Sequence, residues 1–185
     1  MTTTLQFPFR FDSGRLRADL ARFQADGWVR HFNTAIYEGD WSALPLRSIG
    51  GQVNQIFPDP TARNFEPTEI LRHSPYFQEV LDTFRCPLLA ARLLRLKAGS
   101  RIREHTDYKL AFEDGELRLH VPVQTNDNVE FYVAGERVIL REGECWYVNT
   151  SLPHRVDNLG QTDRIHLVID CEVNDWLRSF FPAES

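Results

Sequence analysis

The alternation of apolar and polar residues divides the chain into two parts. From about residue 88 to residue 171, apolar or alternating stretches predict strands, because residues two apart on a strand share a face. The clearest is 116–124, ELRLHVPVQ, in which leucines and valines alternate with Arg118, His120 and Pro122. Further strands are predicted at 87–96, within 129–143 on both sides of Ala134-Gly135, and at 144–150, 154–158 and 164–172. About seven short strands with frequent turns indicate a closed or sandwiched antiparallel sheet, a jelly roll or barrel.

The first 87 residues mix helical and irregular signals. Helical spacing predicts a helix at 14–24, capped by Asp12 or Ser13, and Ser74 followed by proline predicts another at 75–84. Strands are expected at 28–33 and 41–48, and the three prolines within 57–69 indicate a loop. A last helix is expected at 174–181. We therefore expect one domain over 1–185, with a supporting region at 1–87, a strand-rich core at 88–172 and a C-terminal helix within 173–185.

Composition and charge narrow the class of protein. The chain is 42% hydrophobic, which suffices for a sizeable core, and its net charge is −5. An acidic chain with a pI of about 5.7 argues against nucleic-acid binding. Three separated cysteines suggest neither a disulfide framework nor a zinc site, and therefore a reduced, cytoplasmic protein. We expect no signal peptide and no membrane span, because no apolar stretch reaches about 18 residues. The pattern carries no signal of oligomeric state.

The sequence His105-Thr106-Asp107 carries the strongest chemical signal. In an extended segment, residues two apart point to the same side, so an imidazole and a carboxylate converge. A second imidazole would complete a triad that leaves positions open on Fe(II) for a bidentate cosubstrate and O₂. His154 is the best candidate, because it follows a turn and begins a predicted strand. The alternative is that His105 and Asp107 form a surface pair at the end of a strand.

Cationic residues decide whether the cosubstrate is 2-oxoglutarate, which carries two carboxylates. Arg164 begins an otherwise apolar strand; if it points inward, its burial is costly unless an anion pairs with it. If it points outward, it reaches solvent. Arg118 and His120 share one face of their strand and could bind the carboxylate next to the metal. Which face of that strand points into the barrel stays open at this stage.

These motifs together resemble the aspartyl/asparaginyl β-hydroxylase family, which includes bacterial proline cis-4-hydroxylases. The similar stretches are RLLRLKAGSRIREHTD, GELRLHVPV, EGECWYVNTSLPHRVDNLG and DRIHLVIDCE, within residues 91–172. The resemblance implies a mainly β fold with flanking helices, a double-stranded β-helix of the jelly-roll, cupin-like type at 88–172. It also implies an enzyme that uses Fe(II), 2-oxoglutarate and O₂ to hydroxylate an unactivated C–H bond, with release of succinate and CO₂.

Carried over residue by residue, the resemblance assigns His105, Asp107 and His154 as iron ligands. It matches Arg164 to the arginine that holds the distal carboxylate of 2-oxoglutarate, and Arg118 and His120 to the pair near the proximal one. Membrane-bound animal members have glycine in place of the aspartate, so Asp107 follows the bacterial type.

The expected substrate is a small molecule, amino-acid-like or a peptide, because the chain lacks the helical-repeat domain of the animal members. WSALPLRSIGG resembles the N-terminal region of the family, in which an arginine lies near the pocket, so Arg47 is a candidate for a substrate carboxylate. Arg103, near the metal loop, is a second candidate, and Asn54 is a candidate hydrogen-bond partner. Two rival classes are a cupin-type metal protein or dioxygenase without 2-oxoglutarate, and a non-catalytic β-barrel module.

Overall fold

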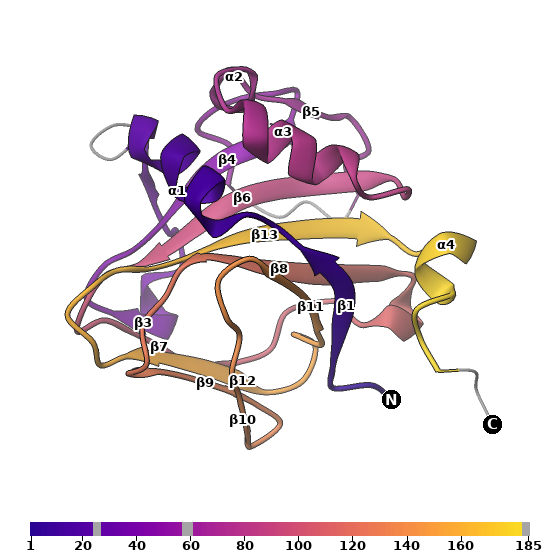
Figure 1. Ribbon diagram of the computed structural model, residues 1–185. Coiled ribbons are helices and arrows are strands. Elements are labelled where there is room, and N and C mark those ends of the chain that lie inside the picture. Colours follow the sequence, from indigo (N-terminus) through magenta and orange to yellow (C-terminus); the bar gives the residue numbers. More distant parts are fainter. Residues whose placement is uncertain (24–26, 57–60, 183–185) are drawn as a thin grey trace.

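Two antiparallel sheets face one another and carry helices on one outer side. The computed structural model describes residues 1–23, 27–56 and 61–182. Within them, the larger sheet has the strand order β1-β11-β8-β13-β6-β4-β2, with β5 paired to β4, and the smaller has the order β10-β9-β12-β7-β3. Helices α1, α2 and α3 cover the larger sheet, whose other face looks toward the smaller sheet (Figure 1). This is the expected mainly β jelly roll.

The strands of the larger sheet come from both ends of the chain. They are β1 (Thr4–Arg10), β2 (Val29–Arg30), β4 (Trp41–Ile49), β5 (Phe65–Pro67), β6 (Leu88–Leu96), β8 (Glu116–Gln124), β11 (Glu144–Val148) and β13 (Arg164–Glu172). Those of the smaller sheet are β3 (Tyr37–Glu38), β7 (Arg101–His105), β9 (Val129–Val133), β10 (Glu136–Val138) and β12 (His154–Asn158). Strands β1 and β4 therefore complete a sheet whose central strands belong to the predicted core.

The helices are short. They are α1 (Ser13–Leu20), α2 (Glu69–Arg72), α3 (Pro75–Asp82) and α4 (Asp175–Arg178), with 3₁₀ turns η1 (Ala21–Phe23), η2 (Thr34–Ile36) and η3 (Phe112–Asp114). Asp12 caps α1 as expected, because its Oδ1 accepts a bond from the backbone N–H of Arg15 at 3.0 Å. No helix among the described residues is long and apolar enough to cross a membrane.

Several predicted elements change in extent. The strand expected at 28–33 ends at Arg30, because the chain turns into η2. The loop expected at 57–69 contains β5, and α2 follows it; residues 57–60 lie outside the described ones, as does residue 24, the expected end of the first helix. Ser74 precedes α3 but does not cap it with its side chain, because its hydroxyl donates to the carbonyl of Ile70.

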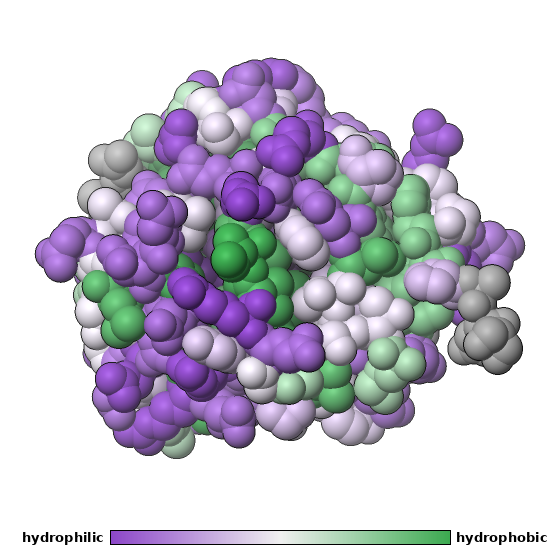
Figure 2. All heavy atoms as spheres, turned by 60° about the horizontal axis from the view of Figure 1, so that its bottom comes forward, coloured by the Kyte–Doolittle hydropathy of each residue, from purple (hydrophilic) through white to green (hydrophobic). Residues whose placement is uncertain are grey.

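Alternation along the strands separates two buried layers. On β8, Leu117, Leu119, Val121 and Val123 pack toward the helices, so Arg118 and His120 face the smaller sheet. The face of β8 that points into the barrel is therefore the one with Arg118 and His120. Among the described residues, no helix covers the outer side of the smaller sheet (Figure 1). The face shown in Figure 2 is mostly hydrophilic, with a hydrophobic patch near its centre. The space between the two sheets therefore holds the polar face of β8, with Arg118 and His120.

Candidate metal and cofactor site

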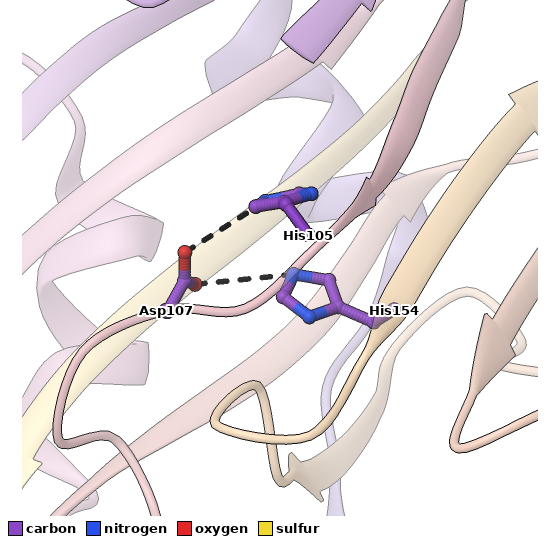
Figure 3. A group of neighbouring side chains, drawn as sticks. All are labelled: His105, Asp107 and His154. Carbon is purple, nitrogen blue, oxygen red and sulfur yellow. Dashed lines mark ion pairs between the residues drawn. The ribbon is translucent and has the colours of Figure 1, made fainter.

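Strand pairing brings His105, Asp107 and His154 together. His105 ends β7, and His154 begins the neighbouring β12 directly opposite it. A register shift in this pair, in which three steps on β7 match two on β12, turns His105 to the inner face that Ile102 occupies. The candidate ligand atoms all lie within 4.8 Å of one another, and Figure 3 shows the three side chains pointing toward a common centre.

The orientation of each imidazole is fixed by a backbone carbonyl. His105 Nδ1 lies 2.8 Å from the carbonyl oxygen of Arg103, and His154 Nδ1 lies 3.0 Å from that of Leu152. Because a carbonyl only accepts, Nδ1 carries the proton in both rings and Nε2 is left for a metal. His105 Nε2 is 3.7 Å from Asp107 Oδ1, and His154 Nε2 is 4.0 Å from Asp107 Oδ2. Burial lowers the pKa of His154 to about 4, which keeps its imidazole neutral near pH 7.

A cavity of about 430 Å³ opens beside these three residues, and we call it the triad pocket. Six of the nine residues singled out from the sequence line it: His105, Asp107, Arg118, His120, His154 and Arg164. The structure therefore brings the candidate metal ligands and the candidate 2-oxoglutarate residues into one space. Two imidazoles and a carboxylate suit Fe(II) with open positions, the donor set expected of a non-haem iron oxygenase.

Arg118 is already paired with carboxylates. Its Nε and Nη2 donate to the two oxygens of Asp170 at 2.7 and 3.0 Å, and its Nη1 donates to Asp107 Oδ2 at 2.5 Å. Burial alone would lower the pKa of Arg118, but these two carboxylates outweigh it and raise the pKa above its usual value. Burial likewise favours the neutral acid at Asp107, but Arg118 and the two histidines hold the pKa of Asp107 below its ordinary value.

Arg164 is the opposite case. It is 2% exposed, and no carboxylate pairs with it among the residues that the structure describes. Its Nη2 donates to His166 Nδ1 at 3.0 Å. Its Nε has no hydrogen-bond partner among the described residues. Burial lowers the pKa of Arg164 to about 9, so the group is cationic at neutral pH and strongly desolvated. His120 Nε2 is also buried without a partner in this part of the chain.

The residues suggested for substrate contacts are not brought to the triad pocket. Arg103 lies on the outer face of β7, where it pairs with Glu38 at 2.7 Å, because the register shift separates its face from that of His105. Arg47 donates to the carbonyl of Phe65 at 2.8 Å, away from the lining of the pocket. Asn54 is exposed in a turn and does not line the pocket either.

Other residues of the pocket had no assigned role. Arg92 on β6 lines it and donates to Asp170 Oδ2 at 3.1 Å. His31 lines its wall and stacks on Trp41, with ring centroids 3.6 Å apart and an interplanar angle of 13°. The sequence does mark Arg92 and Asp170 as candidates for a buried ion pair, because each places a charge in an apolar strand, where an unpaired charge is costly. His31 gave no such signal, because nothing in its local sequence indicates the stack.

Comparison with known proteins identifies the family to which the chain is similar. The family model described as aspartyl/asparaginyl β-hydroxylase matches residues 11–173. L-Proline cis-4-hydroxylase of Rhizobium meliloti (strain 1021) is 29% identical over an alignment of 188 positions that covers 97% of this chain. The match covers 64% of that relative, so the chain spans less than two thirds of its length.

Two solved structures share the fold. An oxidoreductase of the 2OG-Fe(II) oxygenase family from Burkholderia pseudomallei superposes with a TM-score of 0.61 at 16% identity, over 93% of this chain and 86% of that one. HygX from Streptomyces hygroscopicus, with nickel and 2-oxoglutarate bound, gives 0.56 at 15% identity, over 94% and 84%. At this identity the likeness concerns the fold alone.

Proposed function

Because the chain belongs to the aspartyl/asparaginyl β-hydroxylase family, we propose that it is an Fe(II)- and 2-oxoglutarate-dependent oxygenase that hydroxylates a small amino acid. One observation carries this proposal. A triad of His105, Asp107 and His154 shares its cavity with Arg164, a buried guanidinium that no carboxylate of the described chain neutralises. The triad suits the metal, and the unpaired cation suits a carboxylate of the cosubstrate.

The residues fit the two groups that the family uses. His105 and His154 would offer Nε2, and Asp107 would offer a carboxylate oxygen to the metal. Fe(II) and 2-oxoglutarate, when bound, supply the activation of O₂ and the oxidation of a C–H bond, with succinate and CO₂ as the other products. The chain itself orients the ligands, excludes water and positions the substrate carbon.

Arg164 would hold the distal carboxylate of 2-oxoglutarate. A guanidinium offers two parallel N–H donors to a carboxylate, and in a desolvated site that pair is strong. The unpartnered Nε of Arg164 is a buried donor of the pocket that a bound dianion would satisfy. The rival cupin-type reading without 2-oxoglutarate gives no reason for this buried cation.

Charge indicates the class of substrate. Within the described residues, the guanidinium groups of Arg92, Arg118 and Arg164 face two carboxylates, those of Asp107 and Asp170. A divalent metal and doubly charged 2-oxoglutarate cancel one another, so one positive charge is left over. This positive charge attracts the carboxylate of a substrate, and Arg92, whose one ion-pair partner among the described residues is Asp170, is the available donor.

The wall of the pocket suits the carbon skeleton of a small amino acid. His31 and Trp41 present stacked aromatic faces, and Leu94 adds an apolar side chain. Burial, reinforced by the charge of Arg92, lowers the pKa of His31 to about 4, so this wall is uncharged near pH 7. L-Proline, the amino acid in the name of the relative, belongs to the compounds that this space and charge favour.

The test is an assay of the purified protein with Fe(II), ascorbate and 2-oxoglutarate against a panel of free L-amino acids, their carboxamides and short peptides. Succinate and a product heavier by one oxygen atom should form with at least one free amino acid and much less with its carboxamide. The variant Asp107→Ala is the control and should form neither. Absence of succinate with every compound, together with no binding of 2-oxoglutarate by the metal-loaded protein, would rule out this function.

A further inference from the structure

We propose that Asp170 is a positioning residue, which acts through Arg118 to set how Asp107 is presented to the metal. This inference rests on the proposed function, since it concerns the same metal site. Asp170 lies on β13, next to β8, where it is the register partner of Arg118. It neither belongs to the triad nor is one of the residues that line the triad pocket.

The contacts form a continuous chain from the sheet to the triad. Asp170 engages Nε and Nη2 of Arg118 through both of its oxygens, at 2.7 and 3.0 Å. This two-point contact fixes the plane of the guanidinium, because a planar fork held at two donors cannot rotate. The third donor, Nη1, is thereby aimed at Asp107 Oδ2, 2.5 Å away. Arg92 holds Asp170 from the other side, through Nη2 to Oδ2 at 3.1 Å.

The consequence for Asp107 is that its two oxygens differ. Oδ2 accepts a hydrogen bond from Arg118, whereas Oδ1 lies 3.7 Å from His105 Nε2 and accepts no hydrogen bond from the residues that the structure describes. A carboxylate held in this way offers one oxygen to a metal, which keeps the remaining positions open for other ligands. If Arg118 were free to rotate, nothing on β8 would fix which oxygen of Asp107 is left.

Charge acts in the same direction. Arg118 is almost fully buried, and Asp170 neutralises it beside a site for a divalent cation. Without the charge of Asp170, Asp107 would be the one carboxylate left to the buried guanidinium among its described partners, and Arg118 would compete with the metal for it. Loss of Asp170 is therefore expected to weaken metal binding, although Asp170 touches no ligand atom.

The experiment is a titration of the purified protein with Co(II), followed by the visible absorption of the bound ion, without 2-oxoglutarate or substrate. We expect Asp170→Asn to weaken Co(II) binding about 10- to 100-fold, the usual cost of losing a group that orients a ligand, and to change the Co(II) spectrum. The matched control is Glu144→Gln. Glu144 is also a buried acid paired with an arginine, on β11 and outside the pocket, so its removal should leave Co(II) binding unchanged.

A second variant separates positioning from a general effect on folding. If Asp170 acts through Arg118, the double variant D170N/R118M should bind Co(II) as R118M alone does; additive losses would overturn the inference, as would wild-type affinity in D170N. Should D170N fail to fold, Arg118→Lys tests the same link, because one ammonium group cannot serve both carboxylates, and unchanged affinity there would overturn it. A wild-type protein that binds no Co(II) would instead contradict the metal site of the proposed function.

Discussion

The guanidinium Nη2 of Arg164 lies 3.0 Å from Nδ1 of His166, two residues further along the same strand. Since a guanidinium only donates, His166 accepts at Nδ1 and carries its proton on Nε2. His166 is 2% exposed, and burial, together with the positive charge of Arg164, lowers its pKa well below the ordinary value. The contact therefore orients Arg164 without neutralising it, and the charge is retained for an anion.

Removal of that charge should weaken binding of the cosubstrate. We expect Arg164→Met to raise the Kd for 2-oxoglutarate roughly 10- to 100-fold, because hydrogen bonds to charged groups are worth about 1.5–3 kcal/mol. Calorimetric titration of the metal-loaded protein measures this, and the affinity for Co(II) alone should not change. Arg103→Gln is the control, since Arg103 lies on the outer face. Equal 2-oxoglutarate affinity in R164M and wild type would refute the assignment.

Arg92 should determine the preference for a free carboxylate on the substrate. In Arg92→Gln, the ratio of kcat/KM for an amino acid to that for its carboxamide should fall about tenfold or more, because the carboxylate loses its charged partner. Steady-state kinetics on both compounds gives this ratio, which cancels any general loss of activity. An unchanged ratio would mean that another group binds the carboxylate.

The triad should couple metal binding to stability. A ligand that binds only the folded protein raises its melting temperature. Co(II) in excess should therefore raise the Tm of the wild type and leave that of His105→Ala, Asp107→Ala and His154→Ala nearly unchanged. Differential scanning calorimetry with and without the ion measures the shift. A full Co(II)-dependent shift in any of the three variants would remove that residue from the ligand set.

Stability should fall as the protein is acidified. Burial lowers the pKa of His31 and of His154 to about 4, from about 6.5 in the unfolded chain. Between pH 4 and pH 6.5 the unfolded state thus binds more protons than the folded state. The stability that the two neutral imidazoles contribute is therefore complete above pH 6.5 and is lost as the pH falls toward 4. Each histidine changes the free energy of unfolding by up to about 1.4 kcal/mol per pH unit.

Urea unfolding at pH 7 and pH 5, without metal, measures this dependence. His31→Asn should make it shallower, whereas His73→Asn, a change at an exposed position, should not. Equal unfolding free energies at the two pH values in the wild type would contradict the buried, neutral state of both rings.

Strong alternation made most of the core strands predictable, and strand pairing decided what was missed. Strand β1 was not predicted, although Leu5, Phe7 and Phe9 alternate with Gln6, Pro8 and Arg10; Pro8 fits the edge position that β1 holds. Strand β7 is largely polar on its outer face and was not predicted. Its register shift is invisible in the sequence, and it places Arg103 on the opposite face from His105.

The site was predictable to the extent that chemistry is local. His105 and Asp107 are two residues apart, and Arg164 and Arg118 interrupt apolar strands. The role of Asp170 was not predictable, because it depends on the register of β13 against β8 and on the side chain of Arg92 from a third strand. Contacts between strands distant in the chain follow from the sheet as a whole.

The most direct test of the central claim is an anaerobic titration of the Fe(II)-loaded protein with 2-oxoglutarate, followed by the visible charge-transfer absorption that a keto acid chelated to Fe(II) produces. We expect this band to develop with saturation at one equivalent in the wild type, to need a much higher concentration in R164M and to be absent in D107A. A wild-type protein that binds Fe(II) but develops no such band at any concentration of 2-oxoglutarate would contradict the account.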